Sequence, residues 1–436
     1  MAGGASLLLS VVGRKGFKKK MIHVPPALKH RGFVLIWVGL MISMVGTQMQ
    51  QWALFWHISQ LSRDPIAVSV VGGVRFLAVL AFSLVGGLVA DRYNRRTILF
   101  ITQSTAMVVA IVLGLLTFSG EIRLWHIYAL TALQAAAMAF DLPARQSLVP
   151  NLVPRDVLPS AFSLQSIAFN TGAIIGPAMS GLVIGYFGQE AVYFINAGTF
   201  LAVILALVLL GRVPQARTVV QKGLRAAMMD IQDGVTFIRS QPLILSTMVL
   251  DFIATFFSSA NTLLPYFAQN ILHVGEIAYG WLASAQSIGA VFVGLVVSQY
   301  QNIRRQGMLL LGSVVVFGSA TLVFGLSRLY IVIFLALVLM GAADSVSTII
   351  RNTIRQLNTP DSLRGRMTSI NQIFFAGGPQ LGEIEAGVIA QFFGVPFAIV
   401  SGGIGTIFGV WWIVSRWPAL ARYNGDEPTS HSVPAD

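Results

Sequence analysis

The stretch that decides the fold is Gly87-Leu-Val-Ala-Asp91-Arg92-Tyr-Asn-Arg95-Arg96, a short charged turn between two long apolar runs. An altered copy returns 207 residues later in the same setting and reads Gly294-Leu-Val-Val-Ser-Gln-Tyr-Gln-Asn-Ile-Arg304-Arg305. A repeat at half the length of a chain indicates two copies of one structural unit. The sequence therefore predicts a duplicated architecture.

Composition indicates an integral membrane protein. Of the 436 residues, 55% are hydrophobic and only 11% are charged, and several apolar runs exceed the roughly 20 residues that a helix needs to cross a bilayer. Lipid offers no hydrogen bonds to an exposed backbone, so each span must be a helix or part of a closed barrel. Uninterrupted apolar runs without period-two alternation favour helices. We therefore expect an all-α membrane protein.

The apolar runs predict twelve transmembrane helices in two six-helix bundles. They lie near 33–60, 66–90, 97–118, 124–146, 158–186, 190–211, 243–270, 276–299, 307–326, 329–355, 366–393 and 396–415. Asp141 corresponds to Asp344, and Gly176-Pro177 to Gly378-Pro379. Because an even helix count preserves orientation, the bundles should be parallel repeats about a pseudo-two-fold axis along the membrane normal, with a midplane site between them. Such halves are typical of transporters.

Positive charge predicts the orientation. Only Arg63, Arg123 and Arg328 fall in the loops of one side and only Arg75 lies inside a span, whereas the other 25 Lys and Arg share the opposite side. Positive loops stay in the cytoplasm, so both termini should be cytoplasmic. The expected divisions are a cytoplasmic N-terminal tail at 1–30, bundles at 31–211 and 243–416, a cytoplasmic linker at 212–242 and a disordered cytoplasmic C-terminal tail at 417–436.

The linker should form an amphipathic helix on the membrane surface, because its apolar residues recur at helical spacing. They are Leu224, Met228, Ile231 and Val235, with charged residues between them.

Several function classes are excluded. The chain has no cysteine for thiol chemistry, and it contains no GxxxxGK[ST] phosphate loop with which to use ATP. Its six histidines form no HExxH, and GxSxG does not occur, so we expect neither an enzyme nor a metal or other cofactor. The net charge of +12 resides in loops beside apolar runs, which argues against a nucleic-acid partner.

The chain resembles the major facilitator superfamily over residues 30–416. The sharpest piece is the motif GxxxDRxxRR, filled here by Gly87, Asp91, Arg92, Arg95 and Arg96. Within the superfamily, Ala90-Asp91-Arg92, the preceding Arg75 and the run at 143–150 resemble a bacterial branch that contains enterobactin exporters and macrolide efflux proteins. The resemblance implies a secondary transporter in the inner (plasma) membrane. It would export a hydrophobic or amphipathic, drug- or siderophore-like molecule by alternating access and proton antiport.

The resemblance also implies roles for two motifs. In the family, the acidic residue at the position of Asp91 engages the N-terminal end of the eleventh helix, and the motif arginines pair with carboxylates, which stabilises the outward-facing state. The glycine-rich set Gly172, Gly176, Pro177 and Gly181 is similar to the antiporter motif of drug exporters, or else forms a plain packing face. The fourth helix departs from those exporters, because Leu130 to Gln134 contains no arginine.

Embedded carboxylates are the candidates for proton coupling, because a charge at the bilayer centre costs about 2.5–3.5 kcal/mol and needs a partner, a water cavity or a function. Asp251 lies near the midplane and is the first candidate, although a fixed salt bridge to another helix is the alternative. Glu383, beside an expected helix break at Gly377-Gly-Pro379, should line the cavity, whereas Glu385 should point elsewhere. Asp344 is the third candidate, and could instead form an inner-gate contact with Arg351.

Other polar residues are candidates for the cavity and its gate. Arg75 in the outer half could bind an anionic substrate group or pair with Glu383. Asp141 and Arg145 have the i,i+4 spacing of a local ion pair near the inner gate. The remaining substrate-cavity candidates are Gln48, Gln51, Trp52, Phe256, Phe257 and Asn261.

The expected partners are a small-molecule substrate, membrane lipid and a coupling ion, for which a proton is favoured. The chain is expected to be a monomer. A lipid or lysolipid flippase of the same fold is the main alternative, and a receptor or assembly partner that transports nothing is a further one.

Overall fold

The computed structural model describes residues 25–211, 213, 232, 234–258, 260–299 and 303–425. This part of the chain is helical and contains no strand. Most of the predicted linker helix, including Leu224, Met228 and Ile231, lies outside the described residues. The described end of the linker is helical, and there Val235 and the buried Ile238 pack against Met367 and Ile370.

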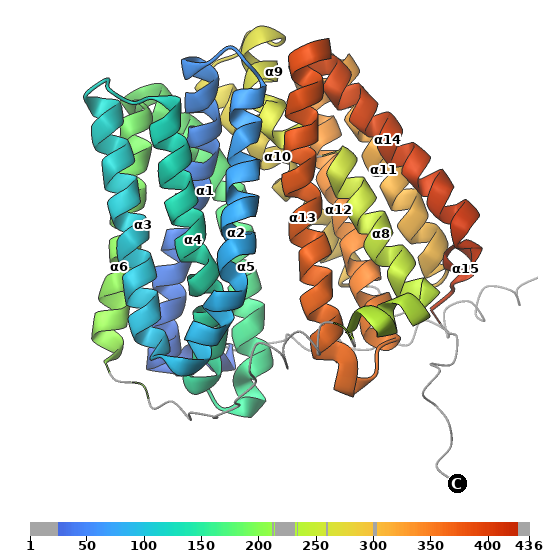
Figure 1. Ribbon diagram of the computed structural model, residues 1–436, viewed down its shortest axis with the longest axis horizontal. Coiled ribbons are helices and arrows are strands. Elements are labelled where there is room, and N and C mark those ends of the chain that lie inside the picture. The colour runs from blue at the N-terminus through green and yellow to red at the C-terminus, as the bar shows by residue number, and fades with distance from the viewer. Residues whose placement is uncertain are drawn as a thin grey trace, which may run out of the picture.

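Six long helices form the first bundle (Figure 1). They are α1 (Arg31–Leu61), α2 (Ile66–Arg92), α3 (Arg95–Phe118), α4 (Leu124–Leu148), α5 (Leu158–Phe187) and α6 (Gln189–Leu210). These bounds agree with the sequence-based spans to within a few residues. Short 3-10 turns at Pro26–Lys29, Val149–Asn151 and Arg155–Val157 flank α1 and join α4 to α5.

The second bundle repeats this plan, with its first span divided. It comprises α8 (Pro242–Phe257), a 3-10 turn (Ala260–Leu263) and α9 (Leu264–Asn270), then α10 (Glu276–Val297), α11 (Gln306–Leu326), α12 (Tyr330–Leu357), α13 (Asp361–Phe393) and α14 (Val395–Arg416). The prediction of one helix over 243–270 is wrong in this respect. Pro265 stands in the first turn of α9, where its missing N–H suits a helix start and not a helix interior.

The described chain contains the twelve spans that the sequence predicts. Eleven helical segments of the described chain are long and apolar enough to cross a membrane. The twelfth span is α13, a 33-residue helix that carries Glu383 and Glu385 and packs along both α2 and α8. The break expected at Gly377-Gly-Pro379 does not occur, because α13 continues through Pro379.

The C-terminal tail is ordered at its start, contrary to the prediction of disorder from Trp417 onward. Pro418–Arg422 form the short helix α15. Leu420 is fully buried in the cluster that contains Leu310 and Ile413, and the Gly307 amide donates a 2.9 Å hydrogen bond to the Tyr423 carbonyl. Apolar burial of Leu420 therefore overrides the polar, proline-rich composition of the tail.

The bundles join at one end of the molecule (Figure 1). There, a single hydrophobic cluster contains Trp52 and Val71 of the first bundle and Tyr266, Tyr279 and Ala386 of the second. Toward the opposite end the apolar clusters belong to one bundle each, such as the cluster around Ile36 and Ala144 and the cluster around Leu250 and Ile350. Among the described residues, the two halves thus share a hydrophobic cluster at the end that holds the α1–α2 connection.

Candidate functional site

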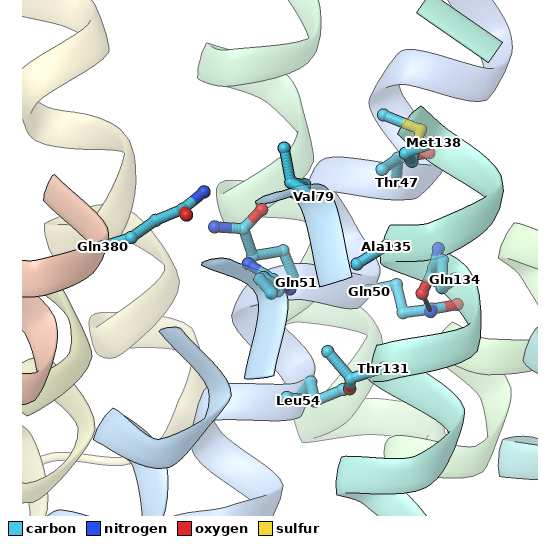
Figure 2. A pocket seen from close by; sticks show the side chains of 11 residues that line it. Thr47, Gln50, Gln51, Leu54, Val79, Thr131, Gln134, Ala135, Met138 and Gln380 are labelled. Atoms are coloured by element: carbon cyan, nitrogen blue, oxygen red, sulfur yellow. Dashed lines mark hydrogen bonds between the residues drawn. The ribbon is translucent and has the colours of Figure 1, made fainter. Parts of the chain in front are cut away.

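A cavity of about 190 Å³ lies between the first bundle and α13, and we call it the amide pocket (Figure 2). Its lining is rich in amides and hydroxyls and comprises Thr47, Gln50, Gln51, Leu54, Arg75, Val79, Thr131, Gln134, Ala135, Met138 and Gln380. Only Gln380 comes from the second bundle, and its side chain extends toward Gln51 (Figure 2). Because both bundles contribute to the lining, the pocket can respond to their relative movement.

A chain of hydrogen bonds supports the amide pocket from behind. The Thr199 hydroxyl donates to the Asn196 side-chain oxygen at 2.8 Å, and Asn196 Nδ2 donates to Gln50 Oε1 at 2.7 Å. Gln50 Nε2 in turn donates to Gln134 Oε1 at 3.0 Å (Figure 2). Asn196 is fully buried on α6, outside the pocket lining. This chain, which we call the amide relay, holds the side chains of Gln50 and Gln134 in place.

A second cavity of about 250 Å³, the acidic pocket, lies within the second bundle. It is lined by Thr255, Ser258, Asn261, Gln286, Ser287, Ala290, Phe317, Gly341, Asp344 and Pro379. Gln286 donates a 3.2 Å hydrogen bond to Asn261. Two consecutive residues of α13 line the two pockets: Pro379 lines the acidic pocket and Gln380 lines the amide pocket.

Arg351 on α12 lies between two carboxylates. Its guanidinium is 2.9 Å from Asp251 on α8 and 3.6 Å from Asp344. The side chains of Asp251 and Arg351 are each only 2% exposed, whereas that of Asp344 is 49% exposed. Asp344 lines the acidic pocket, so its exposed surface faces that cavity. Asp251 forms a salt bridge to another helix, the kind of contact that was the alternative to a coupling role.

A second buried arginine extends this polar region. Arg355 lies one helical turn beyond Arg351 and donates hydrogen bonds to Asn352, at 2.7 Å, and to Asn371 on α13. The sequence analysis named Arg351 only as a possible contact of Asp344 and did not name Arg355. A signal was present, because the predicted span 329–355 includes both arginines at its inner end, although the charge count assigned them to the cytoplasmic side, and an arginine inside a span needs a partner.

Arg75 and Glu383 face each other across the two bundles. The charges of the two side chains interact, and the Arg75 guanidinium also lies 5.8 Å from the centre of the Phe55 ring. Glu383 packs against Gly72, where an added methyl group would meet Glu383 Cβ at 3.0 Å. Arg75 lines the amide pocket, but Glu383 does not. Glu385 is partly buried and lines neither pocket.

The other sequence-based cavity candidates divide between lining and packing. Gln51 and Asn261 line the two pockets. Trp52 is buried against Tyr279 and Phe55. Three further candidates line neither pocket: Gln48 packs against Gly176, Phe257 packs against Gly405, and Phe256 stacks on Phe252. The sequence analysis missed Gln50, Gln134 and Gln380, although glutamines inside apolar helices are a detectable signal.

Hydrogen bonds connect the bundles at their joined end. The Tyr266 hydroxyl lies within hydrogen-bond distance of the carbonyl oxygens of Ser62, at 3.0 Å, and Asp64, at 2.7 Å. Gln269 donates to Ser59 at 3.0 Å, Gln391 donates to Asp64 at 3.3 Å, and Tyr279 donates to the Trp52 carbonyl at 3.0 Å. These contacts close the cavity region at the end where α1 meets α2.

The glycine-rich motif of α5 lies in two close helix contacts. Gly172 and Gly176 face α1, and Gly181 faces Gly280 of α10. A Cβ atom at Gly280 would lie 2.7 Å from the Pro177 carbonyl oxygen and 2.9 Å from Gly181 Cα. Small residues let helix backbones approach closely, so this motif forms part of the contact between the bundles.

The arginines of the GxxxDRxxRR motif bind helix ends. Arg95 donates a 2.8 Å hydrogen bond to the Ser147 carbonyl at the end of α4, and Arg96 donates a 2.7 Å bond to the Leu207 carbonyl near the end of α6. Cations are favourable at helix C-termini, where carbonyl groups lack helical partners. Arg92 is exposed, and Gly87 has no neighbouring atom within 4 Å of an added Cβ. The Asp91 side chain lies outside the described residues.

Asp141 and Arg145 form an ion pair within α4. Asp141 is 1% exposed and also accepts hydrogen bonds from Thr102, at 3.0 Å, and Gln103, at 2.7 Å, on α3. These bonds tie α4 to α3 inside the first bundle.

Comparison with known proteins places the chain in a family. Residues 24–432 match the family described as transmembrane secretion effector. An uncharacterized MFS-type transporter of Bacillus subtilis, YfiS, is 28% identical over 83% of this chain and 88% of its own length. The enterobactin exporter EntS of Citrobacter koseri is 27% identical over 86% and 89%.

Solved structures share the fold. A bacterial homologue of the human lysosomal transporter Spinster, in an inward-facing and unoccupied conformation, superposes with a TM-score of 0.69 at 14% identity and covers 92% of this chain and 98% of its own. The nucleoside transporter NupG gives a TM-score of 0.69 at 12% identity, with coverages of 90% and 99%. The chain is therefore a multi-pass membrane protein of the major facilitator superfamily and belongs to its transmembrane secretion effector family.

Proposed function

We propose that the protein is a secondary transporter that exports an amphipathic small molecule in exchange for protons. The observation that carries this proposal is the environment of Asp344, whose carboxylate faces the acidic pocket while its neighbour Arg351 lies closer to Asp251. A carboxylate held in this way can bind either a proton or a hydrogen-bond donor of the substrate. Competition between the two for one site is the basis of antiport.

Alternating access fits the arrangement of the bundles. The closed end carries the α1–α2 connection, which the charge pattern predicts to be external, so the structure would correspond to an inward-facing state with both termini in the cytoplasm. Rocking of the bundles would break the contacts of Tyr266 and Gln391 and re-form contacts at the other end. We expect a monomer in the inner membrane to suffice, because each chain contains both halves and both pockets.

The similarity to the enterobactin exporter EntS supports export of a small molecule. A lysolipid flippase of the same fold is the second candidate, since many apolar residues surround the two pockets.

Proton-driven uptake into inverted vesicles tests the proposal. Asp344→Asn should abolish uptake driven by a pH gradient, because the amide cannot be protonated, while exchange of labelled for unlabelled substrate persists. Asp156→Asn is the matched control, since Asp156 is exposed and lines neither pocket. Unchanged gradient-driven uptake in the Asp344 variant would reject the coupling role. Translocation of fluorescent lysolipid in proteoliposomes, without efflux of soluble compounds, would favour the flippase.

A further inference from the structure

We propose that the amide pocket binds an anionic or acceptor-rich oxygen group of the substrate, such as a carboxylate, a phenolate or a phosphate. This inference rests on the proposed function and specifies the chemistry of one end of the transported molecule. It depends on the direction of the hydrogen bonds around the pocket.

The amide relay makes Gln134 a donor. Asn196 Nδ2 donates to Gln50 Oε1, and Gln50 Nε2 donates to Gln134 Oε1. A primary amide has one acceptor oxygen and one NH₂ donor group. Because Gln134 Oε1 accepts a hydrogen bond from Gln50 Nε2, the two N–H groups of Gln134 are the donors that its amide can offer to a ligand in the pocket.

Arg75 adds donors and positive charge to the same lining. A guanidinium has five N–H donors and no acceptor, and its planar geometry suits carboxylates and phosphates. The contacts of Arg75 are the Phe55 ring and the charge of Glu383. Glu383 lies between α2 and α13, where it partly offsets the positive charge of Arg75, but it does not line the pocket. The guanidinium therefore remains available to a ligand on the pocket side.

Two further polar atoms are available to a ligand. Thr131 Oγ1 and Gln380 Oε1 are buried and have no hydrogen-bond partner within the described residues, and both residues line the pocket. A buried polar atom without a partner is costly. A ligand that brings several oxygen acceptors and a hydroxyl group would satisfy Thr131, Gln380 and Gln134 together.

The size of the cavity limits what it can hold. Its volume of about 190 Å³ is below the roughly 300–1,000 Å³ of pockets that enclose a whole drug-sized ligand. The amide pocket should therefore receive one polar group of a larger molecule. The acidic pocket, with the opposite charge, lies on the other side of residues 379–380, so a substrate with an oxygen-rich end and a donor end matches both.

Binding by the full-length protein in lipid nanodiscs tests the inference without any transport step. The probes are a dansyl-labelled undecanoate and its trimethylammonium counterpart with the same chain. We expect the carboxylate to bind at least about 10-fold more tightly, because a hydrogen bond to a charged group contributes roughly 1.5–3 kcal/mol. Arg75→Ala and Gln134→Glu should each remove this preference without weakening binding of the ammonium probe.

The amide relay supplies a sharper test. Asn196→Leu should weaken carboxylate binding several-fold although Asn196 lines no pocket, because Gln50 and Gln134 lose their imposed direction. Gln60→Glu is the matched control for Gln134→Glu, since Gln60 is an exposed residue that lines neither pocket. Arg75→Lys is the conservative variant: it keeps the positive charge and should retain part of the preference for the carboxylate probe. All variants are compared as monodisperse protein, so that a loss of binding is not a loss of folding.

The possible outcomes separate this inference from the proposed function. Equal affinity for the two probes, or an unchanged preference in Gln134→Glu, would overturn the inference and leave proton-driven export untouched. Conversely, carboxylate binding with the stated dependences in a protein that transports nothing would reject the proposed function alone. Displacement of the probe by lysophosphatidylglycerol would identify a lipid phosphate as the source of the oxygen group. Displacement by soluble carboxylates alone would identify a free small molecule as the source. Either result supports a site for an oxygen anion.

Discussion

The guanidinium of Arg351 lies 2.9 Å from the carboxylate of Asp251, and both side chains are 2% exposed. The pair connects α12 to α8 inside the second bundle. A buried ion pair contributes little relative to apolar residues of the same size, but the loss of one partner leaves an uncompensated charge. This asymmetry allows a structural role for Asp251 to be separated from a role in proton coupling.

Asp251→Asn should destabilise the protein by about 3–5 kcal/mol, because Arg351 would lose its closest carboxylate in a buried position. Thermal unfolding in detergent measures the effect. The double variant Asp251→Asn with Arg351→Met should recover most of the stability, since the arginine that lost its carboxylate is then replaced by an apolar side chain. An Asp251 variant with wild-type stability and lost proton coupling would instead restore Asp251 as the coupling residue.

Tyr266→Phe should shift the protein toward the state that is open at the α1–α2 end. The change removes a hydroxyl that contacts the carbonyl oxygens of Ser62 and Asp64 across the bundles. A hydrogen bond contributes about 0.5–1.5 kcal/mol, which corresponds to a roughly 2- to 13-fold change in population. Spin labels at the exposed Arg63 and His273 report the change as a longer distance, and labelling is direct because the chain contains no cysteine. An unaltered distance distribution would contradict this role.

Gly280→Ala should hinder closure at the same end. The new methyl group would lie 2.7 Å from the Pro177 carbonyl oxygen and 2.9 Å from Gly181 Cα, and backbone atoms cannot move aside as a side chain can. The same spin-label pair should show a larger open population and a lower transport rate. Gly312→Ala is the matched control, because an added Cβ there has no neighbour within 4 Å. Equal behaviour of the two variants would argue against the glycine contact.

Arg96→Ala should lower the stability of the first bundle by about 1–3 kcal/mol, since it removes a charged donor from the Leu207 carbonyl near the end of α6. Arg92→Ala should have little effect, because Arg92 is exposed. Unfolding temperatures of the two variants in detergent provide the comparison. Equal losses would show that the motif arginines act through their general positive charge and not through helix capping.

Much of the fold was predictable because lipid leaves few options. The twelve spans follow from apolar length, and the observed helices α1 to α6 begin and end within a few residues of the predicted spans. Errors arose where a local rule competes with packing. Pro265 starts a new helix, Pro379 is tolerated inside α13, and burial of Leu420 orders the start of the tail.

The candidate site was predictable only in part. Asp251, Asp344, Arg75 and Gln51 were named as candidates because they interrupt apolar runs, whereas Gln50, Gln134 and Gln380 were missed. The partners of these residues were not predictable, because a hydrogen bond such as that between Gln50 and Gln134 joins residues 84 positions apart. Spacing along one helix also places Gln48 and Trp52 beside Gln51, although both pack against other helices.

The amino-acid sequence alone determined that this chain crosses the membrane twelve times as two related halves, because the cost of burying backbone and charge in lipid acts on each segment separately. Only the tertiary structure decided which embedded carboxylate is tied to an arginine, which amides share a pocket and which end of the molecule is closed. Those properties depend on distances between helices, and such distances are set by side-chain packing across segments that the sequence keeps far apart.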